Sequence, residues 1–141
     1  DGGICTRIDC VSLGVVVNTR AQRFYDEGED FWPKRYAIWG RLVAQQPGQT
    51  AYSIIDSKAI GRFMPPVFKG AQADTLDDLA RQLKLPPAAL LETVRAFNAA
   101  CRPGSFDHAV AQRFAVAGLR SQIGPVFGFT VVVTAGTTAG Q

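Results

Sequence analysis

Residues 75–102 limit the fold most, because their apolar residues recur every three or four positions and two prolines interrupt the pattern. The first apolar stripe consists of Leu76, Leu79, Ala80 and Leu83, and the second consists of Leu90, Leu91, Val94, Phe97 and Cys101. This spacing predicts two amphipathic helices separated by Pro86-Pro87, the second ending near residue 102. Thr75 and Asp78 have the spacing of a capping box at the start of the first helix. The prediction is a helical hairpin that buries its apolar face on another layer of the protein.

Runs of β-branched residues elsewhere predict the strands of a small sheet. The candidate strands are residues 13–18, 51–56 and 127–134, and residues 23–25 are expected to pair back onto the first of them. A helix is expected from Pro33 to about Gln46, a short helix at 57–63, and a loop at 64–70. The acidic stretch 26–30 is interpreted as complementing the N-terminus of the helix that follows it.

These elements predict an α+β fold in which a small β-sheet has helices packed on it, including the helical hairpin in the C-terminal half. The hairpin is expected to bury Leu90, Val94 and Phe97. The expected partners in this core are Leu76, Leu79, and residues 15–17 and 53–55 of the two strands.

The composition fits one domain and argues against several classes of protein. The 141 residues are 47% hydrophobic and 19% charged, with a formal net charge of +3. A chain of this length buries about two thirds of its unfolded surface, which is enough for a core without disulfides. Its apolar runs are shorter than the roughly 18 residues of a membrane helix, so no transmembrane segment is expected. Its basic residues are dispersed, so no nucleic-acid partner is expected.

The cysteines and the one histidine do not have the spacing of a metal site. There are three cysteines, which is an odd number, at positions Cys5, Cys10 and Cys101. His108 has no second pair of metal ligands nearby. No metal is therefore expected, and reduced thiols predict a cytoplasmic location. The sequence also lacks a Gly-x-Ser-x-Gly elbow, a Gly-x-x-x-x-Gly-Lys loop and a Gly-x-Gly-x-x-Gly turn. The sequence motifs alone therefore predict an α+β domain and do not indicate a reaction or a ligand.

Four segments in order resemble the FAD-dependent flavoprotein family of fumarate reductases and succinate dehydrogenases. The segments are 14–24, similar to G-x-x-x-N-x-x-G-x-R-F; the helix carrying Lys34-Arg35; 51–56, similar to A-Y-x-x-x-D; and 73–101, similar to a D-T-L…Y-N helix pair. Residues 23–32 are most similar to tricarballylate dehydrogenases. The resemblance covers about residues 1–108.

The resemblance implies that residues 1–108 are a substrate-capping domain, which in that family is inserted into a larger FAD-binding domain. FAD would then be bound mainly by a part of the parent chain that is not present here, and cofactor-binding residues in this chain are unknown. Asp1-Gly2-Gly3 is interpreted as the cut edge of a longer chain. Residues 109–141 are interpreted as a divergent segment that returns toward the FAD-binding domain.

Arg35 matches the position of the family's proton-transferring arginine, so the resemblance implies a catalytic role for it. In that chemistry a hydride moves between the flavin and one carbon of a carboxylate, and a proton moves at the neighbouring carbon. An arginine has a pKa above about 12, so it needs a relay and close anions to transfer a proton. The alternative interpretation of Arg35 is an exposed helix residue beside the acidic stretch.

Thr6 falls on a threonine that the family uses to hold a substrate carboxylate, so Thr6 and Arg7 are the predicted substrate-binding residues. The family has Glu in place of Arg7 and Arg in place of Cys10, which puts its Glu–Arg proton relay in doubt here. A cation at position 7 suits a substrate with an additional carboxylate. The alternative is that Arg7 is a solvated loop residue.

The leading hypothesis is a fragment of an enzyme that dehydrogenates a tri- or dicarboxylate, as in the conversion of tricarballylate to cis-aconitate. Its expected partners are a small carboxylate substrate, the FAD-binding domain and an unknown electron acceptor. A fumarate reductase-like or ketosteroid dehydrogenase-like relative is the near alternative. A stand-alone α+β binding module without catalysis is the alternative from another class.

Overall fold

The computed structural model describes residues 11–27, 32–60, 62–63, 70–100 and 129–135, with residues 12, 32–37, 58 and 129–135 described by their backbone. The α-helices are α1 (Trp32–Ala44), α2 (Leu76–Gln82) and α3 (Pro87–Ala100), and the strands are β1 (Gly14–Asn18), β2 (Thr50–Asp56), β3 (Gln72–Ala73) and β4 (Phe129–Ala135). Single 3-10 turns occupy Val11–Leu13, Pro47–Gln49 and Ser57–Ala59.

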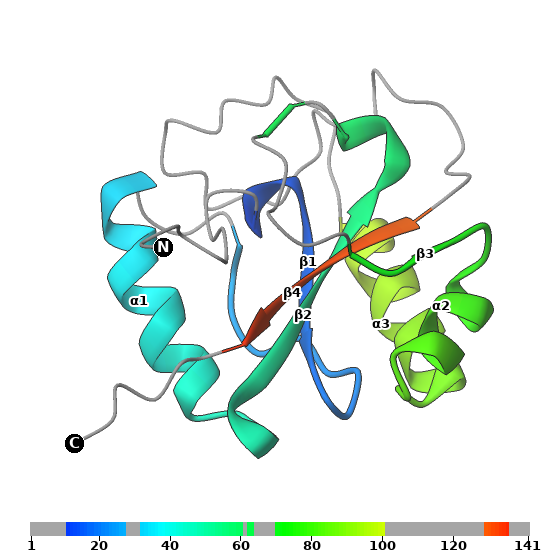
Figure 1. Ribbon diagram of the computed structural model, residues 1–141, viewed down its shortest axis with the longest axis horizontal. Helices are drawn as coiled ribbons and strands as arrows, with labels where there is room; N and C mark the ends of the chain where they lie inside the picture. Colours follow the sequence, from blue (N-terminus) through cyan, green and yellow to red (C-terminus); the bar gives the residue numbers. More distant parts are fainter. Residues whose placement is uncertain (1–10, 28–31, 61, 64–69, 101–128, 136–141) are drawn as a thin grey trace, which may run out of the picture.

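The four described strands form one antiparallel sheet in the order β1-β2-β4-β3. In register, Val16 lies opposite Ser53, and Ser53 lies opposite Val132. The last strand in the sequence therefore lies between β2 and β3 (Figure 1). This confirms the predicted strand near 127–134. The predicted domain boundary at residue 108 lies outside the described residues and stays a prediction.

Helices cover both faces of this sheet, with α1 on one side and the α2–α3 hairpin on the other (Figure 1). Successive residues of a strand point to opposite faces, and β1 follows this rule. Val15 and Val17 pack with the hairpin, whereas Val16 packs with Trp39 and Val43 of α1. The sequence analysis expected all of residues 15–17 to face the hairpin. This was wrong for Val16, because successive residues of a strand face opposite sides of the sheet.

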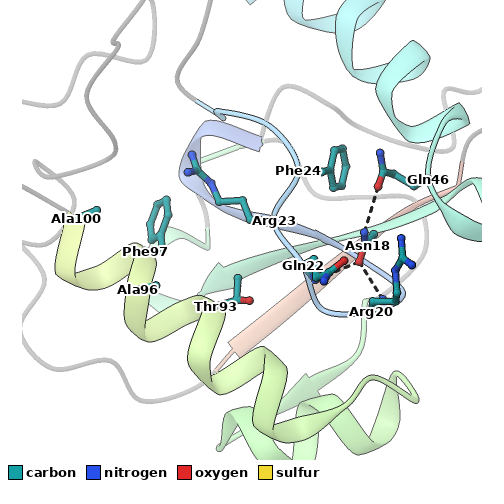
Figure 2. A pocket seen from close by; sticks show the side chains of 10 residues that line it. All are labelled: Asn18, Arg20, Gln22, Arg23, Phe24, Gln46, Thr93, Ala96, Phe97 and Ala100. Atoms are coloured by element: carbon teal, nitrogen blue, oxygen red, sulfur yellow. Dashed lines mark hydrogen bonds between the residues drawn. The ribbon is translucent and has the colours of Figure 1, made fainter.

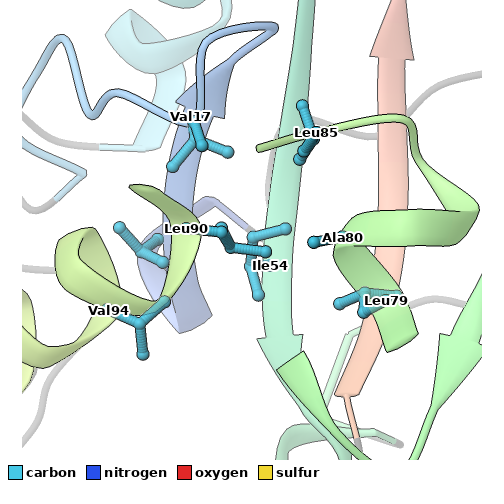
Figure 3. Packing of buried hydrophobic residues seen from close by; sticks show 9 residues of the cluster. Val17, Ile54, Leu79, Ala80, Leu85, Leu90 and Val94 are labelled. Carbon is cyan, nitrogen blue, oxygen red and sulfur yellow. The ribbon is translucent and has the colours of Figure 1, made fainter. Parts of the chain in front are cut away.

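The core under the hairpin contains most of the predicted residues, but Val16, Ser53 and Ile55 do not belong to it. Its buried members are Val15, Val17, Ala21, Ile54, Leu79, Ala80, Leu85, Leu90 and Val94 (Figure 3). Phe97 packs against this cluster while remaining partly exposed. This partial exposure arises because Phe97 lies near the C-terminal end of α3, beside a surface pocket rather than under the sheet.

Helix α2, the first helix of the hairpin, is capped at both of its ends. The Thr75 hydroxyl accepts a hydrogen bond from the Asp78 backbone N–H at 3.1 Å and donates to the Asp78 carboxylate at 2.7 Å, which confirms the predicted cap. At the C-terminus of α2, Leu85 donates to the Ala80 carbonyl and Lys84 to the Arg81 carbonyl. These two bonds form a Schellman motif, in which Lys84 has the left-handed φ of 56°.

Gly14 begins β1 because no larger residue fits there. A Cβ atom built at this position would lie 2.2 Å from the carbonyl oxygen of Ile54 in the paired strand. That oxygen belongs to the backbone, so only a shift of the sheet would relieve the clash. Glycine at this position therefore permits the close approach of β1 and β2.

Several predicted elements differ from the structure in extent. Residues 23–25 make only an isolated bridge, between Arg23 and Val17. Phe24 and Tyr25 pack against Trp39 of α1. The predicted helix at 57–63 is a 3-10 turn over Ser57–Ala59. The two-residue strand β3 was not predicted, since so short a segment carries no alternation. The predicted loop at 64–70 lies outside the described residues except for Gly70.

Candidate functional site

The structure describes the backbone of one predicted site residue and does not describe the other two. Arg35 lies in α1, one helical turn before Trp39, in the part of the helix described by its backbone. Thr6 and Arg7 lie outside the described residues, as do Cys5, Cys10, Cys101 and His108. The structure therefore does not bring the three predicted site residues together or separate them, and their roles stay predictions.

The loop that follows β1 is organised by the side chain of Asn18. Its Oδ1 atom accepts hydrogen bonds from the backbone N–H groups of Arg20 at 2.9 Å and Gln22 at 3.1 Å. Its Nδ2 atom donates to the side chain of Gln46, beyond the C-terminus of α1. An asparagine at this position thus folds the turn and attaches it to α1.

Ala21, at the tip of this turn, has a φ of 59°. The left-handed region favours glycine, which is the residue that the G-x-x-x-N-x-x-G pattern has here. The Ala21 methyl group is buried in the core under the hairpin. Its packing contributes stability that offsets the backbone strain.

Glu27 covers the outer edge of β1 with a buried carboxylate that is 1% exposed. Its Oε1 atom accepts from the backbone N–H of Val16 at 2.7 Å, where a neighbouring strand would otherwise bond. Its Oε2 atom accepts from the Nε of Arg23 at 2.8 Å and also from Nη2 of the same guanidinium. The carboxylate therefore closes the sheet edge and fixes the loop.

This contact corrects the interpretation of one member of the acidic stretch 26–30, namely Glu27. Glu27 bonds to β1 and Arg23 rather than to the N-terminus of α1, and Asp26 bonds to Arg23 at 3.3 Å. Residues 28–30 lie outside the described residues, so their predicted role at the helix stays a prediction. A buried carboxylate with an arginine four residues before it is typical of a paired group.

Burial raises the pKa of Glu27 above its usual value, although hydrogen bonds from Arg23 and Val16 and the charge of Arg23 act in the opposite direction. The native state consequently binds a proton at Glu27 more tightly than the unfolded state does. As the pH rises from about 4.5, the unfolded state loses this proton first, so the contribution of Glu27 to the free energy of unfolding falls until the native carboxyl is also ionised.

Replacing Glu27 by glutamine should remove this dependence. We expect the free energy of unfolding of the wild type, relative to Glu27→Gln, to fall by at most about 1.4 kcal/mol per pH unit within the window above pH 4.5. Urea unfolding of the wild type and of Glu27→Gln between pH 4 and 7 measures this difference in the free energy of unfolding. Asp77→Asn, at an exposed carboxylate on α2, is the control. Parallel pH profiles for wild type and Glu27→Gln would contradict the prediction.

An open pocket of about 670 Å³ lies between this loop, the end of α1 and α3. Its lining residues are Asn18, Arg20, Gln22, Arg23, Phe24, Gln46, Thr93, Ala96, Phe97 and Ala100 (Figure 2). Two of them are cationic and none is acidic. Gln46 follows the C-terminus of α1, and Phe24 packs against Trp39 in the middle of that helix. The sequence analysis did not identify this pocket.

The described residues contain no group of three or more His, Cys, Asp or Glu side chains arranged to hold a metal ion. In the same residues, none of the helices combines the length and the apolar character that a membrane span requires.

Comparison with known proteins identifies the fold. No protein-family model matches the sequence, and no curated protein matches it. Among solved structures, the open conformation of a flavocytochrome c3 fumarate reductase matches 90% of this chain, with a TM-score of 0.60 and 21% identity. The 3-ketosteroid-Δ4-(5α)-dehydrogenase of Rhodococcus jostii RHA1, in complex with 4-androstene-3,17-dione, matches 93% of it, with a TM-score of 0.55 and 21% identity.

The chain has the fold of one part of each protein. It spans 22% of the length of the fumarate reductase and 28% of that of the ketosteroid dehydrogenase. This confirms the predicted α+β fold. At these identities the similarity establishes the arrangement of helices and strands, and the activity is a separate question.

Proposed function

We propose that this chain is the substrate-capping part of an FAD-dependent dehydrogenase that acts on a tri- or dicarboxylate in the cytoplasm. The observation that carries the proposal is that nearly the whole chain matches one part of two redox enzymes with different substrates. The four sequence segments that resemble the fumarate reductase and succinate dehydrogenase family support it independently. Tricarballylate is the proposed substrate because residues 23–32 most resemble the dehydrogenases that act on it.

The described part of the chain shows no site of the kind that usually holds FAD. A dinucleotide pyrophosphate is usually held by a glycine-rich turn between a strand and a helix, whose N–H groups point at the phosphates. In the described part of the chain no such turn exists; for example, Asp74 and Thr75 join β3 to α2. The proposal therefore assigns the cofactor to another part of a longer protein.

This assignment makes a prediction about the isolated chain. Residues 1–141 should bind FAD weakly or not at all. Gel filtration of the purified chain after incubation with FAD, followed by absorbance at flavin wavelengths, measures this. Flavin that stays with the chain in a one-to-one ratio would contradict the prediction.

Arg35 is the proposed proton-transferring residue of the enzyme. Dehydrogenation of a saturated carboxylate removes a hydride from one carbon and a proton from its neighbour, and the flavin of the parent enzyme would accept the hydride. A guanidinium presents planar paired donors that hold a carboxylate in one orientation. The position of Arg35 near the N-terminus of α1, one turn before the sheet-packed Trp39, is compatible with this role.

Thr6 and Arg7 are proposed to bind the substrate carboxylates. A hydroxyl and a guanidinium can each donate to a carboxylate oxygen, and the added positive charge at position 7 favours a substrate with three carboxylates over one with two.

The proposal is tested on the full-length parent protein with an artificial electron acceptor. Tricarballylate, succinate and a 3-ketosteroid are supplied in turn, and reduction of the acceptor is followed. We expect the highest kcat/KM with tricarballylate. Preference for the ketosteroid would replace the carboxylate hypothesis with the alternative that the second structural neighbour favours. A parent protein that lacks flavin absorbance and turns over none of the three would support a binding module instead.

A further inference from the structure

Hydrogen bonds from Thr93, Asn18 and Gln46 hold the walls of the pocket beside α3 in place. Thr93 of α3 donates to the Ala21 carbonyl at 2.7 Å, which fixes the helix to the loop. Gln46 accepts from Asn18 and donates to the Leu42 carbonyl. A ligand entering here would therefore meet a preformed surface and would not have to order the loop first.

Two donor groups of the pocket remain available to a ligand. Within the described part of the chain, the side chains of Arg20 and Gln22 make no hydrogen bond or ion pair, and both residues are exposed. Arg23 differs, because Glu27 and Asp26 already pair with its guanidinium. The uncompensated charge of the pocket thus belongs to Arg20, and it selects for an anion.

The opposite end of the pocket has an aromatic wall. Phe97 is partly buried there, with the guanidinium carbon of Arg23 lying 5.3 Å from its ring centroid. Ala96 and Ala100 of α3 extend this wall toward solvent. Figure 2 shows Phe97 and Arg23 together at one end and Arg20 at the other, with Gln22 between them.

We propose that this pocket binds a small organic anion with a planar apolar body. Its carboxylate lies at Arg20 and Gln22, and its body lies against Phe97 and the neighbouring alanines. The volume of about 670 Å³ is in the range of small-molecule sites. Gln46 of the pocket follows the C-terminus of α1, whereas Arg35 lies in the first turn of that helix, and the proposal does not depend on the proposed dehydrogenase activity.

The test uses 2-naphthoate as the anionic probe and neutral 2-naphthamide as its matched control. Amide chemical shifts of the ¹⁵N-labelled 141-residue chain are followed during titration. We expect saturable changes with naphthoate at Arg20, Gln22, Thr93 and Ala96, and about tenfold weaker binding of naphthamide, because a charge-assisted hydrogen bond is lost.

Two pocket variants and one control complete the experiment. Arg20→Gln removes the free cation at an exposed position and should weaken naphthoate binding about tenfold. Ala96→Glu places an anion in the wall and should abolish it. Arg81→Gln, at an exposed arginine of α2 paired with Asp77, should bind as the wild type does.

The same spectra show whether each variant is folded. The proposal is overturned if naphthoate gives no saturable change, if the changes lie outside the lining residues, or if Arg20→Gln binds as tightly as Arg81→Gln.

Discussion

Replacing Arg35 by lysine in the proposed full-length dehydrogenase is expected to lower turnover by about 100- to 10,000-fold while leaving the flavin bound. This is the range that a positioned proton-transfer group contributes. Lysine keeps the positive charge, but it lacks the planar pair of donors that aligns a carboxylate. The substrate should therefore still be attracted to the site while its reacting carbon is misplaced relative to the proton acceptor.

Arg35→Ala should lower turnover further, because the anionic substrate then loses its partner in a site closed from water. Steady-state dehydrogenation with an artificial acceptor gives kcat and KM for each variant. Flavin absorbance after purification separates a loss of chemistry from a loss of cofactor.

Arg41 provides the matched control on the same helix. It lies six residues after Arg35, which corresponds to about 240° around the helix axis, and it is exposed in the last turn. Arg41→Ala should leave turnover nearly unchanged. If Arg35→Ala keeps near-wild-type kcat while Arg41→Ala does not, the wrong arginine has been assigned. If both variants are active, the role implied by the family resemblance does not hold for this helix.

The elements that sequence predicted well are those whose pattern reports burial directly. The hairpin helices α2 and α3 carry apolar stripes, and Thr75 and Asp78 mark their start, so the sequence places both within about a turn. The strands β1, β2 and β4 are rich in β-branched residues, which suit a buried sheet. The order of the strands could not be predicted from such local patterns, because the position of β4 between β2 and β3 depends on pairing between residues far apart in the sequence.

The loop after β1 shows what local pattern does not reveal. Arg23, Asp26 and Glu27 read as an ordinary charged segment, yet Glu27 is fully buried against the edge of β1. Its burial depends on Val16, which is eleven positions away and exposes its N–H only because β1 is an edge strand. The pocket has the same origin, since Arg20 of the loop and Phe97 of α3 line one pocket only when α3 packs on the loop.

Truncating Leu90 to alanine is expected to lower the free energy of unfolding by about 2–5 kcal/mol. Leu90 lies at the centre of the core under the hairpin, with 0% of its surface exposed. It joins α3 to Val17 of β1, Ile54 of β2 and Leu79 of α2 (Figure 3). Its removal leaves a cavity that three elements would have to close together, which puts the cost toward the upper part of that range.

The neighbouring Leu91 offers a control with the same chemistry and helix propensity. It is 37% exposed, so Leu91→Ala should change the free energy of unfolding by only about 0.5 kcal/mol. Urea unfolding monitored by circular dichroism measures both variants. Domains of this size have a total stability of about 5–15 kcal/mol, so Leu90→Ala should shift the midpoint visibly. Equal losses for the two variants would mean that α3 is rotated about its axis relative to the sheet. The assignment of Thr93, Ala96 and Phe97 to the pocket wall would then fail as well, because these residues share one rigid helix with Leu90.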